Sequence, residues 1–227
     1  LDIQSGAEVD LGTQEFTLRD TGTLTADGTF TASTSTVVLE GSATLPDPGV
    51  SFNNLQINTG QNLSAQTITN TLTLNGSNAS VANGGTPTYD TATLAYAQDN
   101  AVTVTTHEWP NTGGPDLVDV LGTTAVTLNA SRTLSGIGSR ALRINAGAEF
   151  TVSGSTTLAV GNGVAGTAAN SNGTLTVNGT LQINTNGFAL IPPKYGSNAI
   201  LRYNSGNVFG RADEWSSKSG SGYPTNV

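Results

Sequence analysis

The residues that most readily suggest chemistry are two glutamate–tryptophan pairs, Glu108-Trp109 and Glu214-Trp215. An indole ring that faces solvent can stack on a sugar, and each pair follows a strand-like segment that contains a tyrosine. The candidate residues for glycan contact are therefore Trp109, Trp215, Tyr96 and Tyr203.

A structural role explains the same two pairs. Neighbouring residues of a strand point to opposite sides, so a tryptophan inside a coil would leave its glutamate outside, near the glycine-rich turn that follows. A repeated structural unit also repeats its core residues, and the pair occurs once in each of two related passages. We therefore expect the tryptophans to fill the interior and the glutamates to face solvent.

Catalysis is a further possibility. Hydrolysis of a glycosidic bond needs two carboxyl groups about 5–10 Å apart, and the acidic residues that could supply them include Glu8, Glu15, Asp116, Asp119, Asp213 and Glu214. The sequence has a single histidine, His107, and no cysteine, a combination that rarely forms a metal site. No Gly-x-Ser-x-Gly or phosphate-loop motif occurs. We expect no enzyme activity, no cofactor and no metal site.

Thr-x-Thr triplets occur at several places, including 67–69, 71–73 and 174–176. Aligned threonines on a flat face could bind ice, but the triplets are irregularly spaced, and threonine is a favourable strand residue in any case. The triplets therefore predict strands in which the middle residue is usually buried.

A long internal repeat organises these elements. The passage 92–120 recurs in outline as 199–227, 107 positions later, and residues 1–9 recur as 142–150. A long unit that is itself made of short strand-and-turn pieces is typical of solenoids rather than of one closed globule.

Short strands are predicted by pairs of apolar residues that flank one polar residue. Such pairs include Leu1/Ile3, Val9/Leu11, Phe16/Leu18, Leu55/Ile57, Leu72/Leu74, Val126/Leu128, Leu142/Ile144, Phe150/Val152, Leu175/Val177 and Leu181/Ile183. Turn residues such as Asn178-Gly179 separate them, and the pairs recur too closely to leave room for the helix of a βαβ unit. Three strands would make a coil of about 20 residues, which gives about eleven coils in all.

The fold that fits best is a right-handed parallel β-helix. It is predicted to run as one continuous solenoid over residues 1–227, with super-repeats over approximately 14–120 and 121–227. Tandem antiparallel β-sandwiches are the alternative, because Asn-Gly between apolar pairs is also a hairpin pattern. Similar short passages recur at unequal separations along the chain, which favours the β-helix, since stacked coils tolerate insertions in their turns. A long turn is expected between Gly161 and Gly173.

The composition limits the possible partners. The formal net charge is −8 and only 11% of the residues are charged, so the chain has no basic stripe for nucleic acid. No apolar run approaches the roughly 20 residues that span a bilayer. An acidic, cysteine-free chain rich in threonine, asparagine and glycine suits an extracellular setting, and we expect it to act there.

The combined motifs resemble a known class of repeat. An apolar-x-Tyr strand, the Glu-Trp pair, a Gly/Pro turn, a final Asn/Asp-Val and the segment Phe52–Asn58 are together similar to the repeat regions of large secreted, adhesin-like surface proteins of Bacteroidetes-type bacteria. The resemblance covers most of the chain and implies a β-helical protein, usually one exported by type IX secretion. Asp90-Thr91-Ala92 also looks like the short O-glycosylation motif of such bacteria.

These observations favour a non-catalytic structural module of an extracellular cell-surface adhesin, stalk or filament. The alternative is a carbohydrate-active β-helix enzyme, lyase-like or glycosidase-like, or a glycan-binding module. The expected partners are further repeats of the same polypeptide or identical subunits end to end, with surface glycans as additional candidates; neither nucleic acid nor membrane insertion is expected. Because Leu1 and Val227 both fall within the repeat pattern, coils are predicted to continue beyond them.

Overall fold

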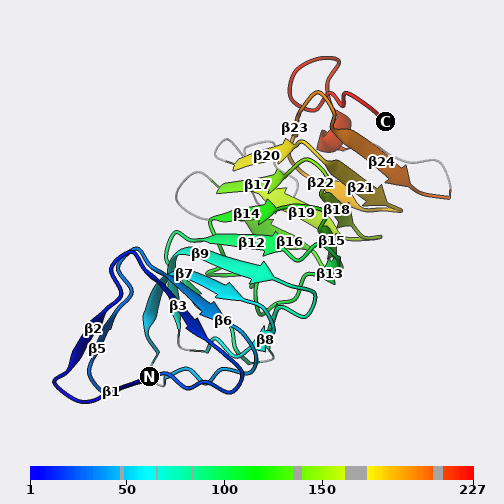
Figure 1. Cartoon of the computed structure of the whole chain (residues 1–227). Coiled ribbons are helices and arrows are strands. Elements are labelled where there is room, and N and C mark those ends of the chain that lie inside the picture. The colour runs from blue at the N-terminus through cyan, green and yellow to red at the C-terminus, as the bar shows by residue number, and fades with distance from the viewer. Residues whose placement is uncertain (47–48, 65, 83, 135–139, 162–172, 207–211) are drawn as a thin grey trace. The chain divides into compact units, whose positions relative to one another are not determined.

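A computed structural model describes residues 1–46, 49–64, 66–82, 84–134, 140–161, 173–206 and 212–227 (Figure 1). The chain divides into two compact units. Unit 1 comprises Leu1–Gln98 and Thr105–Pro115, and unit 2 comprises Asp99–Val104 and Asp116–Val227. The long turn expected between Gly161 and Gly173 lies, apart from those two end residues, outside the described residues.

Unit 1 consists of short strands that pair in parallel. Its strands are β1 (Asp2–Ile3), β2 (Glu8–Asp10), β3 (Glu15–Leu18), β4 (Thr25–Ala26), β5 (Thr29–Thr31), β6 (Thr36–Leu39), β7 (Ser51–Ile57), β8 (Gly60–Gln61), β9 (Thr67–Asn75), β10 (Ser80–Val81), β11 (Thr88–Tyr89) and β12 (Thr93–Ala97). The longest ladder runs β3, β6, β7, β9 and β12, and β11 pairs with the first part of β9. Three short parallel pairs, β1/β4, β2/β5 and β8/β10, are formed by strands that come between those of the ladder along the chain or precede them.

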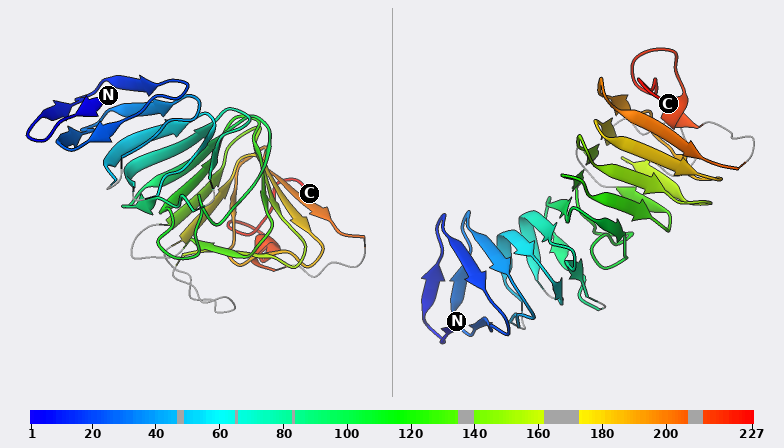
Figure 2. Two further views of the ribbon diagram at one scale, coloured as in Figure 1. Left: turned by 90° about the horizontal axis from the view of Figure 1, so that it is seen from below. Right: turned by 45° about the vertical axis from the view of Figure 1, so that its right-hand side comes forward.

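Unit 2 has three parallel ladders, one on each side of its coils (Figure 2). Its elements are β13 (Ala101–Thr103), β14 (Leu117–Val120), β15 (Ala125–Leu128), β16 (Arg132–Leu134), β17 (Arg140–Ile144), β18 (Glu149–Val152), β19 (Thr157–Val160), β20 (Gly173–Val177), β21 (Thr180–Asn184), β22 (Phe188–Ala189), β23 (Lys194–Tyr195), β24 (Ile200–Asn204) and the 3₁₀-helix η1 (Asp213–Trp215). The ladders are β14/β17/β20/β23, β13/β15/β18/β21/β24 and β16/β19/β22. Three strands therefore complete one coil, as the spacing of the apolar pairs predicts.

The interior is made of the predicted apolar pairs. Fully buried pairs include Leu55/Ile57, Val126/Leu128, Leu142/Ile144, Phe150/Val152, Leu175/Val177 and Leu181/Ile183. Burying a side chain of this size stabilises the fold by about 1.5–3 kcal/mol, so each coil contributes several such increments. The pattern is weaker at β1 and β2, where Leu1 is 44% exposed and Val9 is half-buried. Each of these two strands pairs with a neighbour on one side only within the described residues.

The similarity between residues 1–9 and 142–150 is explained by a corner of the coil that both units form. In unit 2 the Ala148 N–H donates to the Asn145 carbonyl, and in the next coil the Gly179 N–H donates to the Ile144 carbonyl and the Thr180 N–H to the Ala148 carbonyl. The matching bonds in unit 1 run from Ala7 to Gln4, from Gly28 to Ile3 and from Thr29 to Ala7. Equal sequence thus produces equal hydrogen bonding at this corner.

The prediction of a parallel β-helix is confirmed, because the described residues form parallel sheets stacked as a β-solenoid of about eight turns. The alternative of antiparallel sandwiches is wrong, since every strand pairing among the described residues is parallel. The estimate of about eleven coils was too high because the coils are longer than expected. Facing residues of neighbouring strands lie 20 positions apart at Leu181/Leu201, 24 at Leu142/Val118 and 33 at Leu142/Leu175.

Candidate functional site

The first glutamate–tryptophan pair closes a hydrogen-bonded cluster in unit 1. Glu108 is 3% exposed, and its carboxylate accepts hydrogen bonds from the backbone N–H and the hydroxyl of Thr105. The Tyr96 hydroxyl approaches the same carboxylate at 3.5 Å, and the Tyr89 hydroxyl donates to the Glu108 carbonyl oxygen at 2.6 Å. Because Tyr89 lies on β11 and Tyr96 on β12, the cluster ties the turn that carries Glu108 to both strands.

The second pair builds the same arrangement in unit 2. Glu214, in η1, is fully buried, and its Oε1 accepts hydrogen bonds from the Ala212 N–H at 2.8 Å and the Tyr203 hydroxyl at 3.3 Å. The Tyr195 hydroxyl donates to the Glu214 carbonyl oxygen at 2.7 Å. The two tyrosines lie on β23 and β24, so this loop is also tied to two successive strands.

The expectation that both glutamates face solvent is wrong. It rested on the alternation of a strand, but Glu108 lies in a turn and Glu214 in a 3₁₀-helix, where neighbouring residues do not point to opposite sides. A buried carboxylate is tolerated where hydrogen-bond donors surround it. Here the donors come from the loop itself and from a tyrosine on β12 or β24, although Oε2 of Glu214 has no hydrogen-bond partner among the described residues.

The tryptophans differ between the two units. Trp109 is fully buried, as expected, and Tyr96 is 1% exposed, so neither ring offers a face to a solvent-borne ligand. Trp215 and Tyr203 are half-buried and stack on each other, with ring centroids 6.4 Å apart and an angle of 18° between the planes. Glycan contact through the four aromatic residues stays a prediction, and accessible ring surface is found only in the second pair.

Burial also controls the ionisation of the two tyrosines that bind the glutamate carbonyls. Loss of solvent raises the pKa of Tyr89 well above its usual value, and the negative charge of Glu108 raises it further. Burial is likewise the main cause that raises the pKa of Tyr195, with smaller contributions from Tyr203 and Glu214. Both hydroxyls therefore stay protonated, as hydrogen-bond donors, throughout the neutral range.

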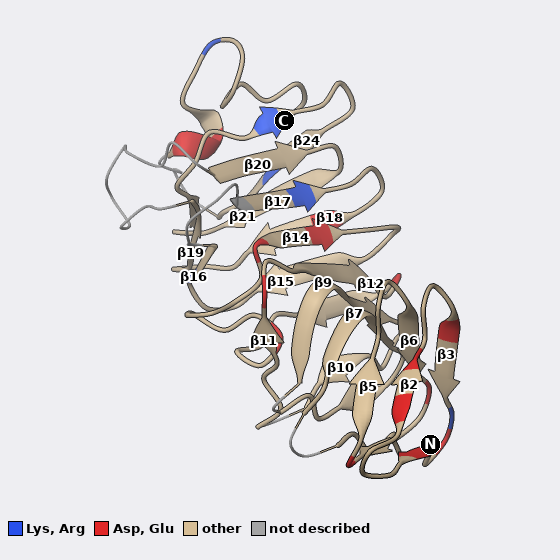
Figure 3. Ribbon diagram, turned by 90° about the vertical axis from the view of Figure 1, so that its left-hand side faces the viewer, with Lys and Arg blue, Asp and Glu red and all other residues tan. Residues whose placement is uncertain are grey.

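The acidic residues considered for catalysis lie in different environments. Glu8 and Glu15 are exposed on β2 and β3, and Glu214 is enclosed in the cluster described above. Asp119 on β14 forms an ion pair with Arg143 on β17, the neighbouring strand (Figure 3). The remaining candidates, Asp116 and Asp213, are half-buried, as is His107.

Two searches of the described residues complete this inventory. In that part of the chain no three histidine, aspartate or glutamate side chains gather closely enough to hold a metal ion. No helix found there has the length and hydrophobicity needed to span a bilayer.

The threonine triplets on β9 and β20 behave as strand residues. Thr71 and Thr73 flank the fully buried Leu72, and Thr174 and Thr176 flank the fully buried Leu175. The middle residue is thus the buried one, as predicted.

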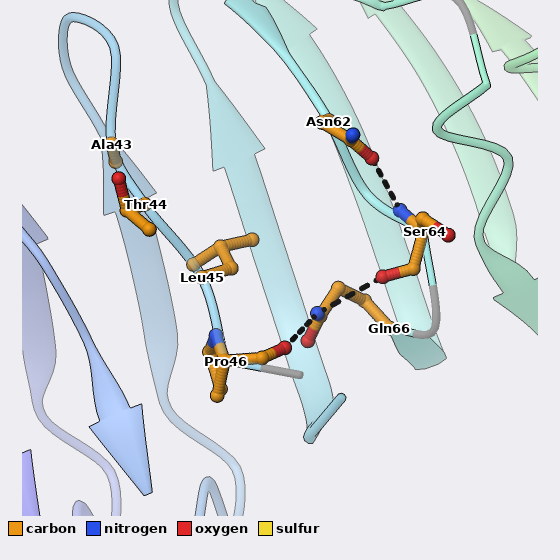
Figure 4. Close-up of a pocket in the computed structure, with 7 residues that line it drawn as sticks. All are labelled: Ala43, Thr44, Leu45, Pro46, Asn62, Ser64 and Gln66. Carbon is orange, nitrogen blue, oxygen red and sulfur yellow. Dashed lines mark hydrogen bonds between the residues drawn. The ribbon is translucent and has the colours of Figure 1, made fainter. Parts of the chain in front are cut away.

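A surface pocket of about 380 Å³ lies in unit 1 (Figure 4). Its lining residues come from two stretches, one between β6 and β7 and the other between β8 and β9: Ala43, Thr44, Leu45, Pro46, Asn62, Ser64 and Gln66. None of these residues was predicted as a ligand contact, because the two stretches are about 20 positions apart and share no motif.

The tyrosine partners of the two glutamates were not predicted from the sequence. Tyr89 and Tyr195 lie 106 positions apart, and each comes 19 residues before the glutamate of its Glu-Trp pair. The long repeat could therefore have identified them as members of the cluster. Thr105 has no such counterpart among the described residues, since the position that corresponds to it is not described.

Comparison with known proteins gives no assignment. No protein-family model, no curated protein and no solved structure matches the chain.

Proposed function

We propose that this chain is a non-catalytic structural module of an extracellular cell-surface adhesin, stalk or filament. The observation that carries the proposal is the recurrence of one hydrogen-bonded cluster, in which a buried glutamate holds a loop against two tyrosine-bearing strands. It occurs around Glu108 in unit 1 and around Glu214 in unit 2. The most conspicuous polar residues of the repeat are therefore used to hold the fold together.

The parallel ladders support the same function. In a solenoid each coil contacts mainly its neighbours, so units can be added without redesign of the core. The partners proposed here are accordingly further repeats of the same polypeptide or identical subunits end to end. The resemblance to secreted adhesin-like repeats and the acidic composition rich in threonine, asparagine and glycine support an extracellular location.

The repeat hypothesis is tested by adding a second copy of residues 121–227 directly after Val227. We expect the circular dichroism per residue and the melting temperature to stay close to those of the original chain, while small-angle scattering shows a longer particle. An inserted segment with the same composition in scrambled order is the control, and it should remain unfolded. Loss of the native spectrum in the extended chain would contradict the proposal.

Two further measurements separate a structural role from the alternatives. Incubation with a panel of neutral and acidic polysaccharides should give no new reducing ends and no unsaturated products. Protease added to intact cells of the producing organism should remove the module, as expected for a protein at the cell surface. Turnover that is abolished by substituting an aspartate or glutamate would replace the structural role with an enzymatic one.

A further inference from the structure

The pocket of unit 1 has a rigid frame. Gln66 is 1% exposed, and its amide hydrogen-bonds to both walls of the pocket. Nε2 donates to the carbonyl oxygens of Pro46 at 2.9 Å and Ser64 at 3.1 Å, and Oε1 accepts from the Val50 N–H at 2.9 Å. A buried, fully hydrogen-bonded amide fixes both chain segments, so the pocket is formed before any ligand arrives.

The rim of the pocket carries polar groups that remain available. Asn62, Ser64 and Thr44 are exposed. The Asn62 Oδ1 accepts from the Ser64 N–H at 2.9 Å, which orients the amide and leaves its amino group for a ligand. Within the described residues the hydroxyls of Thr44 and Ser64 make no hydrogen bond. These groups can together donate and accept several hydrogen bonds, Asn62 and Ser64 from one wall of the pocket and Thr44 from the wall opposite.

The remaining lining is apolar. Leu45 and Ala43 are half-buried and Pro46 is buried, and Figure 4 shows them on the wall opposite Asn62 and Ser64. One wall of the pocket therefore combines Ala43, Leu45 and Pro46 with the Thr44 hydroxyl, and the other carries the Asn62 amide and the Ser64 hydroxyl; none of the seven described residues that line it is ionisable.

This combination selects a class of ligand. An ionic ligand would find no opposite charge among the described lining residues, and a purely aliphatic one would leave the rim groups without partners after losing their water. A sugar ring presents C–H groups on its faces and hydroxyls around its edge, which matches both walls. The volume of about 380 Å³ is near the lower end of the range for ligand pockets, which suits a single ring rather than a longer chain.

We propose that this pocket binds one neutral monosaccharide unit. Leu45 and Pro46 pack against the C–H groups of the ring, while Thr44, Asn62 and Ser64 hydrogen-bond its hydroxyls. The site does not depend on the proposed structural role, because it uses residues outside the tyrosine–glutamate cluster. It would add recognition of a neutral glycan to a module that is otherwise structural.

The test is a ¹H–¹⁵N NMR titration of the full chain with methyl glycosides of glucose, galactose, mannose and N-acetylglucosamine, each in both anomeric forms. At least one glycoside should produce saturable shifts confined to the backbone of the lining residues and the Asn62 side chain. Methyl glucuronide, which carries a carboxylate, should bind more weakly. The proposal is wrong if all neutral glycosides leave the pocket signals unchanged at millimolar concentrations, or if the glucuronide binds as well.

Variants then locate the binding. Thr44→Val keeps the shape of the side chain and removes only its hydroxyl, and Asn62→Ala removes the rim amide. Each should weaken binding roughly three- to tenfold, the loss expected for one or two hydrogen bonds. Asn78→Ala, at an exposed position of the same unit, is the matched control and should leave affinity unchanged. Binding that survives Thr44→Val and Asn62→Ala but disappears with Trp215→Ala would place the site at the aromatic pair and overturn the proposal.

Discussion

Replacement of Gly179 by alanine tests the corner that both units share. An added Cβ at this position would lie 2.2 Å from the Ala148 carbonyl oxygen and 2.4 Å from that of Asn145. Both atoms belong to the backbone, so neither can rotate away as a flexible side chain could. Gly179→Ala must therefore displace the chain of one coil relative to the next.

The magnitude follows from what that displacement disrupts. Overpacking a well-filled site costs about 1–3 kcal/mol. The Ala148 oxygen also accepts the Thr180 N–H at 2.9 Å, and the Gly179 N–H donates to Ile144 at 3.1 Å. Weakening these bonds adds up to about 1 kcal/mol each. We expect Gly179→Ala to lower the free energy of unfolding by about 3 kcal/mol, which for a chain of this size corresponds to roughly 6–12 °C in melting temperature.

The assay is thermal and urea unfolding followed by circular dichroism, with hydrogen exchange to locate the change. Gly206→Ala is the matched control, because a Cβ there meets no atom within 4 Å, and it should change stability by less than about 0.5 kcal/mol. Exchange should accelerate first in the strands on either side of the corner, β18 and β21. The reasoning is refuted if Gly179→Ala is no more destabilising than the control.

Three further predictions concern the tyrosine–glutamate clusters. Glu108→Gln should cost about 1–3 kcal/mol in urea unfolding, because both carboxylate oxygens accept hydrogen bonds from Thr105 and the amide would turn its NH₂ toward a donor; an unchanged midpoint would show that the carboxylate is dispensable. The raised pKa of Tyr89 favours the neutral phenol in the folded state, so this contribution to stability is complete below about pH 10 and is lost as the pH rises further. Tyr89→Phe should therefore lose melting temperature less steeply than the original chain above that pH, and equal slopes would argue against the burial of the hydroxyl. Trp109→Ala should cost about 3–5 kcal/mol in the same unfolding assay, whereas Trp215→Ala, at a half-buried ring, should cost about 1–2 kcal/mol; equal losses would contradict the difference in burial.

The sequence was sufficient for the strand pattern because alternation is a local property. Leu142 and Ile144 flank Arg143, and a strand necessarily turns the outer two to one side and the middle one to the other. Both apolar residues are fully buried, and Arg143 is exposed. The repeat of this pattern at short, irregular intervals was likewise enough to favour stacked coils over sandwiches.

The same local reasoning failed where the chain leaves the strands. It placed Glu108 in solvent because it treated the Glu-Trp pair as strand residues, whereas the loop folds back on Tyr89 and Tyr96. It also overestimated the number of coils, since the length of a turn is not limited by the ladder that it connects. Both errors concern backbone that no periodic pattern describes.

The sequence by itself thus determined the strand pattern, its parallel stacking and the apolar pairs of the interior, because those follow from which side of a strand each side chain occupies. Only the tertiary structure decided which polar groups meet. Gln66 joins Pro46 to Ser64 across two coils, and the exposure of a tryptophan differs between Trp109 and Trp215 although the motif around them is the same. Contacts of this kind depend on the distance between segments of neighbouring coils, and that distance is set by packing in three dimensions rather than by spacing along the chain.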